Sequence, residues 1–342
     1  MRRVAMHSET AFGWAGVALV AALVAAAASG AAVSRSTAAP FSSVTLGDSY
    51  SAGEGVAPFL GTGGCHRSSR AYATWVRRPG AAKTLYAIAS GGGRPGILAG
   101  KNKHGSERNV RSAGGVTWAF WACSGATTAN VLPQSLGGVP QRRVGRVLDR
   151  ATQLDSANLT RADLVTLTIG GNDAGFVDAL LVCALARCDT RAFEEERAAI
   201  IGGTRPRLEK VYRAIAREAP RARILVLGYP QLFPATKAEQ SCAGLSAFAG
   251  EQGLLRRLGA ELNGTIAAAV ATVARSGAKI EFVPVAARFA GHEICGRKGP
   301  WLNGLVRSKE GLGLEAGSFH PNLRGQRDGY AGAVNAALAR GR

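Results

Sequence analysis

Several patterns on which whole classes of protein depend are missing from this sequence. It has no nucleotide-binding motif and no C-x-x-C pair, and His66 directly follows Cys65, which leaves the two too close to share a tetrahedral metal ion easily. We therefore expect neither a metal ion nor a cofactor. Aromatic residues make up only 6% of the chain and no nucleic-acid-reading motif is present, so a nucleic-acid partner is not expected.

Acidic residues are also scarce. Lys and Arg number 42 against 23 Asp and Glu, which gives a formal net charge of +19. The plain interpretation is that many basic side chains cover solvated helix faces. The alternative is a transient attraction to an anionic surface, such as phospholipid headgroups or wall polymers.

Long hydrophobic runs occur only at the start of the chain. Two arginines precede an almost uncharged stretch, Ala11 to Val33, which is rich in Ala and Val and is followed by small residues. This pattern is typical of a secretory signal peptide, with cleavage expected between about Ser29 and Pro40. Residues 1–39 are thus predicted as a leader. An uncleaved membrane anchor is the alternative, because the run is about 20 residues long.

Residues 40–342 are predicted to form one domain of a secreted, monomeric protein. The domain contains an even number of cysteines, which in an exported chain suggests three disulfides. Six cysteines allow 15 connectivities, and sequence alone cannot choose among them. The cysteines are Cys65, Cys123, Cys183, Cys188, Cys242 and Cys295.

Beyond the leader, apolar runs typical of strands alternate with longer segments of helical spacing. The expected strands are Val44–Leu46, Trp118–Cys123, Asp163–Ile169, Arg223–Leu227 and Lys279–Val283. The expected helices are Val139–Leu154, Phe193–Glu218, Ser246–Ser276 and Arg324–Arg340. Strands separated by helices of this length predict a parallel sheet with helices on both faces.

The segment Ala87–Gly115 interrupts this alternation. It is rich in glycine, carries several Lys and Arg residues and has almost no apolar periodicity. We interpret it as a long surface loop or a partly disordered insertion. A mobile cover over a binding site is the alternative interpretation.

Three positions whose polar groups can take part in a reaction follow the ends of expected strands. Ser49 follows the first strand, Gly125 the second and Asn172 the third. Because ligands sit outside the carboxyl ends of parallel strands, we expect these positions to converge. The lipase elbow G-x-S-x-G is absent, but the glycine-rich strand exit exposes the Ser49 hydroxyl by the same physics. The N–H groups of Ser49 and Gly125 and the side-chain amide of Asn172 are candidate donors to an oxyanion.

A serine nucleophile needs a base, and histidine is scarce. The chain has only His7, His66, His104, His292 and His320. His320 precedes a proline in the loop before the last expected helix, from where it can reach the same edge of the sheet. It is therefore the candidate base. Asp48 adjoins Ser49, but neighbouring side chains on an extended exit point in opposite directions, so we expect Asp48 to bond the turn backbone.

Four blocks of the sequence resemble the SGNH (GDSL-type) hydrolases. They are G-D-S-Y-S at 47–51, A-C-S-G-A-T-T at 122–128, G-G-N-D at 170–173 and H-P-N at 320–322. The stretch from Cys65 to Tyr72 is similar to one in the secreted actinobacterial lipases and esterases of this group. The resemblance implies an α/β protein with a flavodoxin-like three-layer α/β/α sandwich and a central parallel sheet.

The resemblance also implies an activity and roles for residues. It implies a secreted serine esterase or lipase that hydrolyses carboxylic esters through an acyl-serine. Ser49 would be the nucleophile and His320 the base, and Ser49, Gly125 and Asn172 would form the oxyanion hole. It further implies disulfides in chain order, which are Cys65 with Cys123, Cys183 with Cys188 and Cys242 with Cys295.

One position departs from the pattern of many relatives. Three residues before His320, where they carry an acid, this chain has Gly317. The favoured interpretation is a Ser–His dyad, with a backbone carbonyl at or near Gly317 holding the second imidazole nitrogen. The alternative is a carboxylate from elsewhere, for which Glu315 and Asp328 are the nearest in sequence.

Other functions stay open at this stage. A polysaccharide O-deacetylase or a phospholipase would use the same fold and residues on a different ester. From another class, the chain could be a catalytically degenerate, basic surface-binding protein, an idea that only the missing acid supports.

Overall fold

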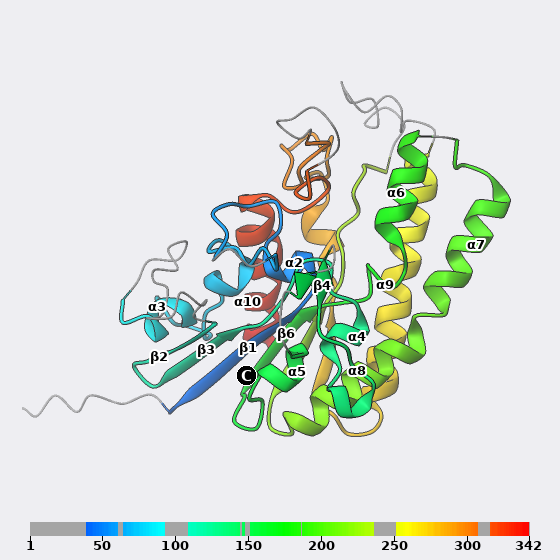
Figure 1. The fold of residues 1–342 in the computed structure, drawn as a ribbon. Coiled ribbons are helices and arrows are strands. Elements are labelled where there is room, and N and C mark those ends of the chain that lie inside the picture. The colour runs from blue at the N-terminus through cyan, green and yellow to red at the C-terminus, as the bar shows by residue number, and fades with distance from the viewer. Residues whose placement is uncertain are drawn as a thin grey trace, which may run out of the picture. The chain divides into compact units, whose positions relative to one another are not determined.

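A six-stranded sheet forms the centre of the computed structural model (Figure 1). The structure describes residues 39–341 without 61–63, 93–108, 144–145, 148–150, 186, 236–250 and 307–314. The strands are β1 (Phe41–Gly47), β2 (Val110–Ala113), β3 (Val116–Phe120), β6 (Leu164–Thr168), β7 (Arg223–Leu227) and β8 (Ile280–Val283). Their order in the sheet is β2-β3-β1-β6-β7-β8. All neighbours pair in parallel except β2, which runs antiparallel to β3 at one edge.

The strand order creates one crevice at a defined place. The chain starts in β1, passes to β3 on one side, and then returns to the other side to build β6, β7 and β8. This is the flavodoxin-like order, and it reverses direction at β1, so ligands are expected outside the carboxyl ends of β1 and its neighbours. The expected flavodoxin-like α/β fold is confirmed, with β2 as an added antiparallel edge.

Helices cover both faces of the sheet (Figure 1). On one face lie η1 (Tyr72–Trp75), α3 (Leu85–Ala89) and α10 (Ala331–Arg340), which contact one another through η1. On the other face lie α4 (Thr128–Val131), α5 (Gln153–Ser156), α7 (Arg191–Gly202), α8 (Arg205–Glu218) and α9 (Gln252–Ala274). The remaining short helices are α2 (Ser49–Ala52), α6 (Phe176–Leu185), η2 (Gln134–Leu136), η5 (Ala286–Phe289) and η6 (Gly325–Tyr330).

The central strands β6 and β7 form because they are rich in apolar and β-branched residues. All five residues of β6 are buried, as are the last four of β7. Parallel strands covered by helices on both faces carry such continuous apolar runs. In α8, which packs against α9, the residues at helical spacing are buried, as their period predicts; they are Leu208, Val211, Tyr212 and Ile215.

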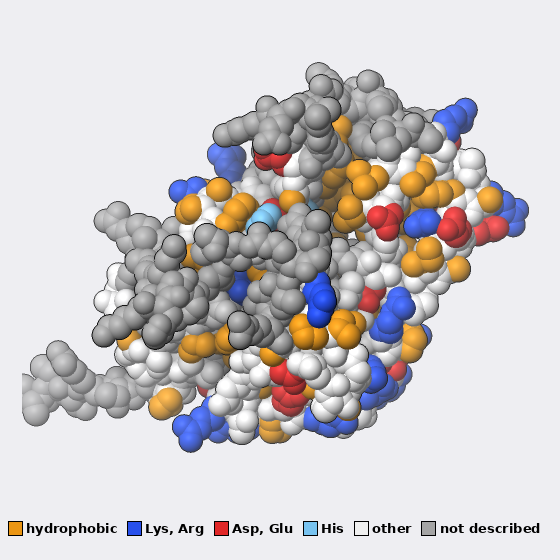
Figure 2. Space-filling model, viewed as in Figure 1, with side chains coloured by type: hydrophobic (Ala, Val, Ile, Leu, Met, Phe, Trp, Pro, Cys, Tyr) orange, Lys and Arg blue, Asp and Glu red, His pale blue; other side chains and the backbone are white. Residues whose placement is uncertain are grey.

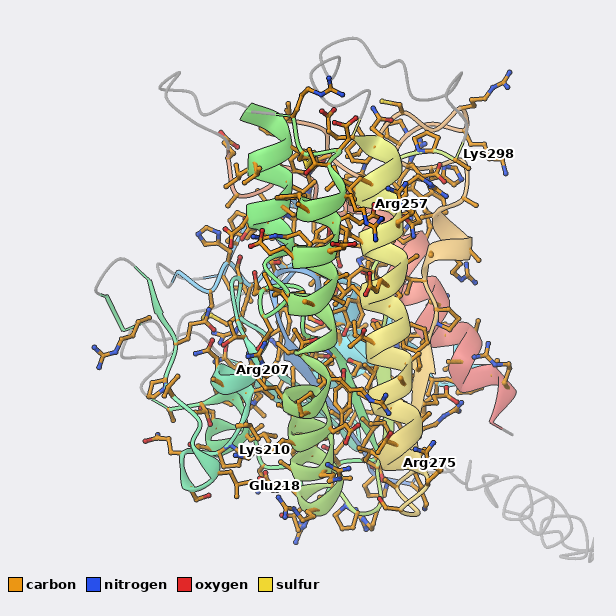
Figure 3. The ribbon with its side chains drawn as sticks, turned by 90° about the vertical axis from the view of Figure 1, so that its right-hand side faces the viewer. Arg207, Lys210, Glu218, Arg257, Arg275 and Lys298 are labelled. Atoms are coloured by element: carbon orange, nitrogen blue, oxygen red, sulfur yellow. A yellow bond between two sulfur atoms is a disulfide. The ribbon has the colours of Figure 1, made fainter. Side chains whose placement is uncertain are left out.

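Charged side chains lie mostly on the outer surface of the helical layers. Figure 3 shows α7, α8 and α9 side by side, with Arg207, Lys210, Arg257 and Arg275 among the charged residues that they present. Several of these cations pair with acids, such as Arg257 with Glu194. This spread over solvated helix faces is consistent with the plain interpretation of the net charge.

Two helix predictions were wrong. Residues 139–154 do not form one helix but a two-stranded ribbon of β4 (Arg142–Arg143) and β5 (Arg146–Val147), followed by the short α5. Pro140 and Gly145 are poor residues for a helix interior. The expected helix Phe193–Glu218 is divided between α7 and α8 at Gly203 and Thr204, and Pro206 lies in the first turn of α8.

The ends of the glycine-rich insertion are ordered, which corrects the loop interpretation there. Ala87 belongs to α3, whose residue Leu85 packs in the core, and β2 extends the sheet through its pairing with β3. The remainder of the predicted insertion, residues 93–108, lies outside the described residues, as does the predicted leader. Within the described chain, no helix is long and apolar enough to cross a bilayer.

Two of the three expected disulfides are confirmed. Cys65 is bonded to Cys123, and Cys183 to Cys188. The third expected pair includes Cys242, which lies outside the described residues, so its pairing with Cys295 stays a prediction.

Candidate active site

Ser49 is the first residue of α2, directly after β1. Gly47 ends the strand with φ of 116°, and a Cβ there would lie 2.2 Å from the Thr168 carbonyl oxygen, so only glycine allows β1 to end this close to β6. Asp48 is the N-cap of α2, because its Oδ1 accepts from the Tyr50 N–H at 3.0 Å. The expected role of Asp48 in bonding the turn backbone is confirmed.

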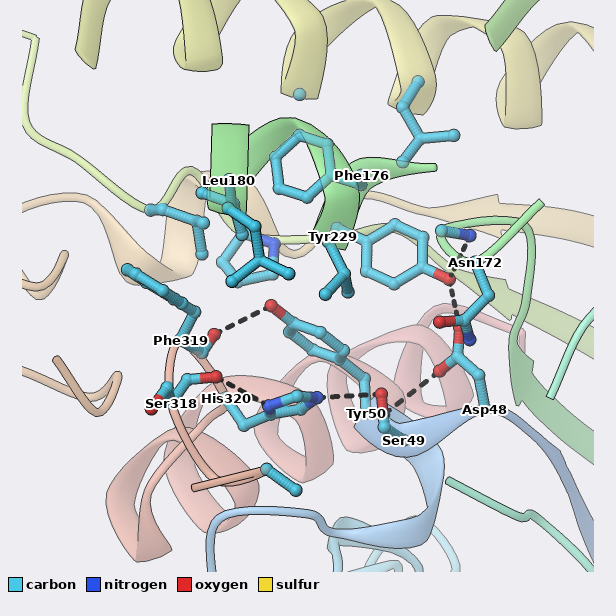
Figure 4. Close-up of a pocket in the computed structure, with 18 of the residues that line it drawn as sticks. Asp48, Ser49, Tyr50, Asn172, Phe176, Leu180, Tyr229, Ser318, Phe319 and His320 are labelled. Carbon is cyan, nitrogen blue, oxygen red and sulfur yellow. Dashed lines mark hydrogen bonds between the residues drawn. The ribbon is translucent and has the colours of Figure 1, made fainter. Parts of the chain in front are cut away.

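His320 meets Ser49 at this edge of the sheet (Figure 4). Its Nε2 lies 2.8 Å from Ser49 Oγ, although the two residues are 271 positions apart in the chain. On the other side of the ring, Nδ1 lies 2.9 Å from the Ser318 carbonyl oxygen. The expected contact between this serine and this histidine is therefore confirmed.

Gly317 does not supply the carbonyl that faces the imidazole, which corrects the expectation. Its carbonyl oxygen instead accepts from the Asn303 side chain at 3.1 Å and from the His320 backbone N–H at 3.3 Å. The acceptor for Nδ1 is the next carbonyl, that of Ser318. The kind of interaction matches the expectation, and the residue that makes it is shifted by one position.

Asn303 and Tyr50 hold the histidine loop in place. Phe319 has φ of 62°, an unfavourable left-handed conformation for a residue with a Cβ. Its N–H donates to the Asn303 carbonyl at 3.1 Å, and its own carbonyl accepts from Tyr50 Oη at 2.9 Å. The Asn303 side chain also donates to the Gly55 carbonyl at 3.1 Å, which ties the histidine loop to the segment after Ser49. No sequence pattern drew attention to Asn303.

The surroundings of His320 favour its neutral form. Burial lowers the pKa of the imidazole below its usual value, while the charge of Glu54 and the carbonyls of Ser318 and Ala316 act in the opposite direction. Burial alone would raise the pKa of Glu54, but hydrogen bonds from His66 and Ser124 outweigh it and keep this carboxyl ionised. The imidazole is thus unprotonated near neutral pH, the form that can accept a proton from a hydroxyl.

Asp48 also connects the serine turn to the loop after β6. Its Oδ1 accepts from Thr168 Oγ1 at 2.6 Å, and its Oδ2 accepts from the Tyr229 hydroxyl. That hydroxyl in turn accepts from the Gly171 N–H at 3.0 Å. Because its carboxyl is fully buried, the pKa of Asp48 is raised to about 6 despite these bonds. No sequence motif marks Tyr229, which lies two residues beyond the end of β7.

The three candidate oxyanion donors lie at the ends of adjacent strands. The Ser49 N–H is at the first position of α2, where no intrahelical acceptor exists. Gly125, with φ of 81°, follows β3, and the Asn172 side-chain amide donates to the neighbouring Ala126 carbonyl at 2.8 Å. Asp173 accepts from both the Thr128 N–H and its hydroxyl, at 2.9 Å and 2.6 Å, and so braces the Asn172 loop against α4.

A cavity of about 220 Å³ opens beside Ser49 and His320. Asn172 lines it on the side of the candidate oxyanion donors (Figure 4). Most of the remaining wall is apolar and comes from Phe176, Val177, Leu180, Leu181, Leu232 and Leu262. In the described ranges, no three His, Cys, Asp or Glu side chains are grouped as a metal site would need.

Fold and site together define a class of protein. A serine in contact with a neutral histidine, at the crevice of a flavodoxin-like sheet and beside an apolar cavity, is the arrangement of an ester hydrolase. The GDSL-like lipase/acylhydrolase family model matches residues 45–327, and the chain belongs to this family. The protein is thus an ester hydrolase, as the resemblance implied.

Its relatives include several Streptomyces enzymes. A lipase of Streptomyces rimosus is 32% identical over 300 residues, which cover 86% of this chain and 85% of that protein. The solved structure of an extracellular lipase from Streptomyces rimosus has a TM-score of 0.58 and 29% identity, covering 87% of this chain and 99% of that one. A phospholipase A1 structure from Streptomyces albidoflavus has the same TM-score and coverage at 27% identity.

Proposed function

We propose that the protein is a secreted esterase or lipase that hydrolyses carboxylic esters through an acyl-serine intermediate. The observation that carries this proposal is the 2.8 Å contact between Ser49 Oγ and His320 Nε2 at the mouth of an apolar cavity. A degenerate surface-binding protein has no need to keep this contact, so the alternative from another class is disfavoured.

In the proposed mechanism, Ser49 Oγ attacks the ester carbonyl carbon while its proton passes to His320 Nε2. The carbonyl oxygen becomes an oxyanion and accepts hydrogen bonds from the Ser49 N–H, the Gly125 N–H and the Asn172 amide. The intermediate collapses, the C–O bond to the alcohol breaks, and the imidazolium gives the alcohol its proton. A water molecule then attacks the acyl-serine, with His320 again taking and returning the proton.

We propose that this machinery is a dyad without a carboxylate. The Nδ1–H of His320 donates to the Ser318 carbonyl, which fixes the tautomer that leaves Nε2 free to accept. Asp328 pairs with Arg327 at 2.8 Å, and Glu315 is exposed on the cavity wall. Glu54 acts only through its charge, which favours the imidazolium.

The apolar wall favours a fatty acyl group as the part of the substrate that the cavity holds. Sugar sites use polar clefts with aromatic platforms, whereas this wall is mostly aliphatic, so the deacetylase alternative is less well supported. The similarity to a phospholipase A1 makes phospholipid the second candidate substrate.

A series of p-nitrophenyl esters tests the proposed activity. From acetate to octanoate, kcat/KM should rise at least about tenfold, because each buried methylene contributes about 0.8 kcal/mol. Leu180→Trp, which fills part of the cavity, should move the preference to shorter chains while acetate hydrolysis stays near the wild-type rate. A preference of the wild-type enzyme for acetate over all longer esters would contradict the acyl site.

Export and monomeric action belong to the same proposal. Residues 1–39 have the composition of a cleavable leader, and a structural relative is an extracellular lipase. We propose that residues 40–342 act as a secreted enzyme on lipid or other small ester substrates.

We further propose that α6 brings the enzyme to a lipid surface. Asp178 is the one charged residue among the ten of this helix. Its apolar side chains are nevertheless exposed, since Val177, Leu181 and Val182 are 50%, 41% and 40% exposed. A helix that is apolar all round is normally buried in a protein core or in a membrane. This one adjoins the cavity, and in Figure 2 hydrophobic side chains gather over its position. Binding there would place the cavity mouth against the lipid.

Val182→Asp tests this surface, because Val182 lies outside the cavity wall. Its binding to vesicles of phosphatidylcholine and phosphatidylglycerol should weaken about tenfold in sedimentation, since a valine burial is lost. Hydrolysis of p-nitrophenyl acetate should stay unchanged. Val139→Asp is the matched control, because Val139 is 51% exposed and lies outside α6. This variant should bind as wild type. Equal binding by all three proteins would rule out α6 as the contact.

A further inference from the structure

The peptide group between Ser124 and Gly125 is held by a side chain that no motif includes. Gln141 Nε2 donates to the Ser124 carbonyl oxygen at 2.9 Å in a buried hydrogen bond. Gln141 is itself buried, and it follows Gly125 by 16 positions, just before β4. The N–H of the same peptide group belongs to Gly125, the candidate oxyanion donor.

From this contact, we propose that Gln141 is a positioning residue that aims and strengthens the Gly125 N–H as an oxyanion donor. The inference rests on the proposed ester hydrolysis. A peptide group is planar, so its carbonyl and its N–H point in opposite directions, and fixing one end fixes the other. A hydrogen bond accepted by the carbonyl also polarises the group and makes its N–H a stronger donor.

The backbone at this point needs such a restraint. Gly125 has φ of 81° and no Cβ, so little in its own conformation opposes rotation of the preceding peptide group. The other polar groups of Ser124 are already engaged, because its N–H donates to the Cys65 carbonyl at 2.9 Å and its hydroxyl bonds Glu54. These contacts hold Ser124 itself, and Gln141 acts on the peptide that carries the donor.

A comparison with Gln153 separates positioning from general stabilisation. Gln153 is also buried, and both atoms of its amide are paired, because Oε1 accepts from the Gly47 N–H at 2.7 Å and Nε2 donates to the Gly47 carbonyl at 2.8 Å. For Gln141, Oε1 has no hydrogen-bond partner within the described chain. A buried amide with one unpaired atom contributes little to stability, so stability alone does not account for a glutamine here.

The test compares Gln141→Leu with Gln153→Leu and with Gln134→Leu, the same change at an exposed position. Three quantities are measured for each protein: kcat and KM on p-nitrophenyl butyrate, the inhibition constant of an alkylboronic acid, and the melting temperature. The boronic acid forms a tetrahedral, anionic adduct on a serine and therefore reports on the oxyanion donors. Gln141→Met is a second variant that also lacks the donor.

For Gln141→Leu we expect kcat to fall about tenfold, less than the 10² to 10³ typical of losing a whole donor. KM should stay within about twofold, boronate affinity should fall by the same factor as kcat, and the melting temperature should stay within about 3 °C. Gln153→Leu should melt at a clearly lower temperature, and Gln134→Leu should match the wild type throughout.

Two results would overturn the inference. One is wild-type kcat and boronate affinity in both Gln141 variants. The other is a fall in kcat accompanied by the loss of stability seen for Gln153→Leu, with boronate affinity of the folded protein unchanged. Failure of the proposed function itself is distinguishable, because then the wild-type enzyme would neither hydrolyse the ester nor bind the boronic acid.

Discussion

Replacing Ser49 by alanine should lower kcat for ester hydrolysis by about a million-fold, to the level that binding and oxyanion donors alone support. The side chain is small, 8% exposed and at the start of a short helix, so the change leaves the fold intact. The catalytic loss follows because the variant has no oxygen that can form the acyl-enzyme. Initial rates on p-nitrophenyl butyrate, with circular dichroism as a check on folding, measure it.

Ser135→Ala is the matched control, since Ser135 is exposed in η2 and lies outside the cavity wall. It should retain the wild-type kcat. Activity of Ser49→Ala within about a hundredfold of wild type would mean that another group attacks the ester.

His320→Ala should lose at least about 10⁴ in kcat, because among the described residues His320 is the base in contact with Ser49 Oγ that takes its proton. The two acids nearest in sequence give the comparison that defines the dyad. Glu315→Gln and Asp328→Asn should each keep kcat within about threefold, because neither carboxylate holds the imidazole. A loss near 10⁴ in either amide variant would show that a carboxylate orients His320 after all.

The pH dependence should follow from the same residue. Protonated His320 cannot accept the Ser49 proton, so kcat/KM should fall as pH decreases through the pKa of the imidazole. Because burial lowers that pKa, the midpoint of this acid limb should lie below the usual value of about 6.5. A midpoint above 7 would indicate that an ionised carboxylate dominates the environment of the ring.

The sequence predicted those parts of the fold that rest on uniform local signals. The runs that became β6 and β7 are buried, and their length of about five residues between turns favours a strand, because helices are normally longer. The segment 139–154 was mispredicted because its apolar residues recur at helical spacing from Val144 to Leu154, although Pro140 and Gly145 disfavour a helix. The α6 helix was missed because a helix that is apolar all round has no period to recognise.

The site was predictable as far as side chains with chemical functions mark it. Ser49 and Asn172 carry functional groups at strand exits, so their convergence followed from parallel topology. His320 was marked by its place in the loop before the last helix and by the scarcity of histidine. The Ser318 carbonyl could not be assigned, because which backbone oxygen faces Nδ1 depends on the left-handed turn at Phe319. Asn303 and Gln141 act through backbone groups of distant segments, and such contacts leave no local pattern in a single sequence.

Covalent trapping shows whether Ser49 is a nucleophile that His320 activates. The mature protein is treated with an alkyl fluorophosphonate, which transfers one phosphonyl group to an activated serine, and the product is analysed by intact-mass and peptide mass spectrometry. We expect a single addition on the peptide that contains Ser49, at a rate at least about 10⁴ lower in His320→Ala. An unmodified Ser49, or labelling that proceeds equally fast without the His320 imidazole, would contradict it.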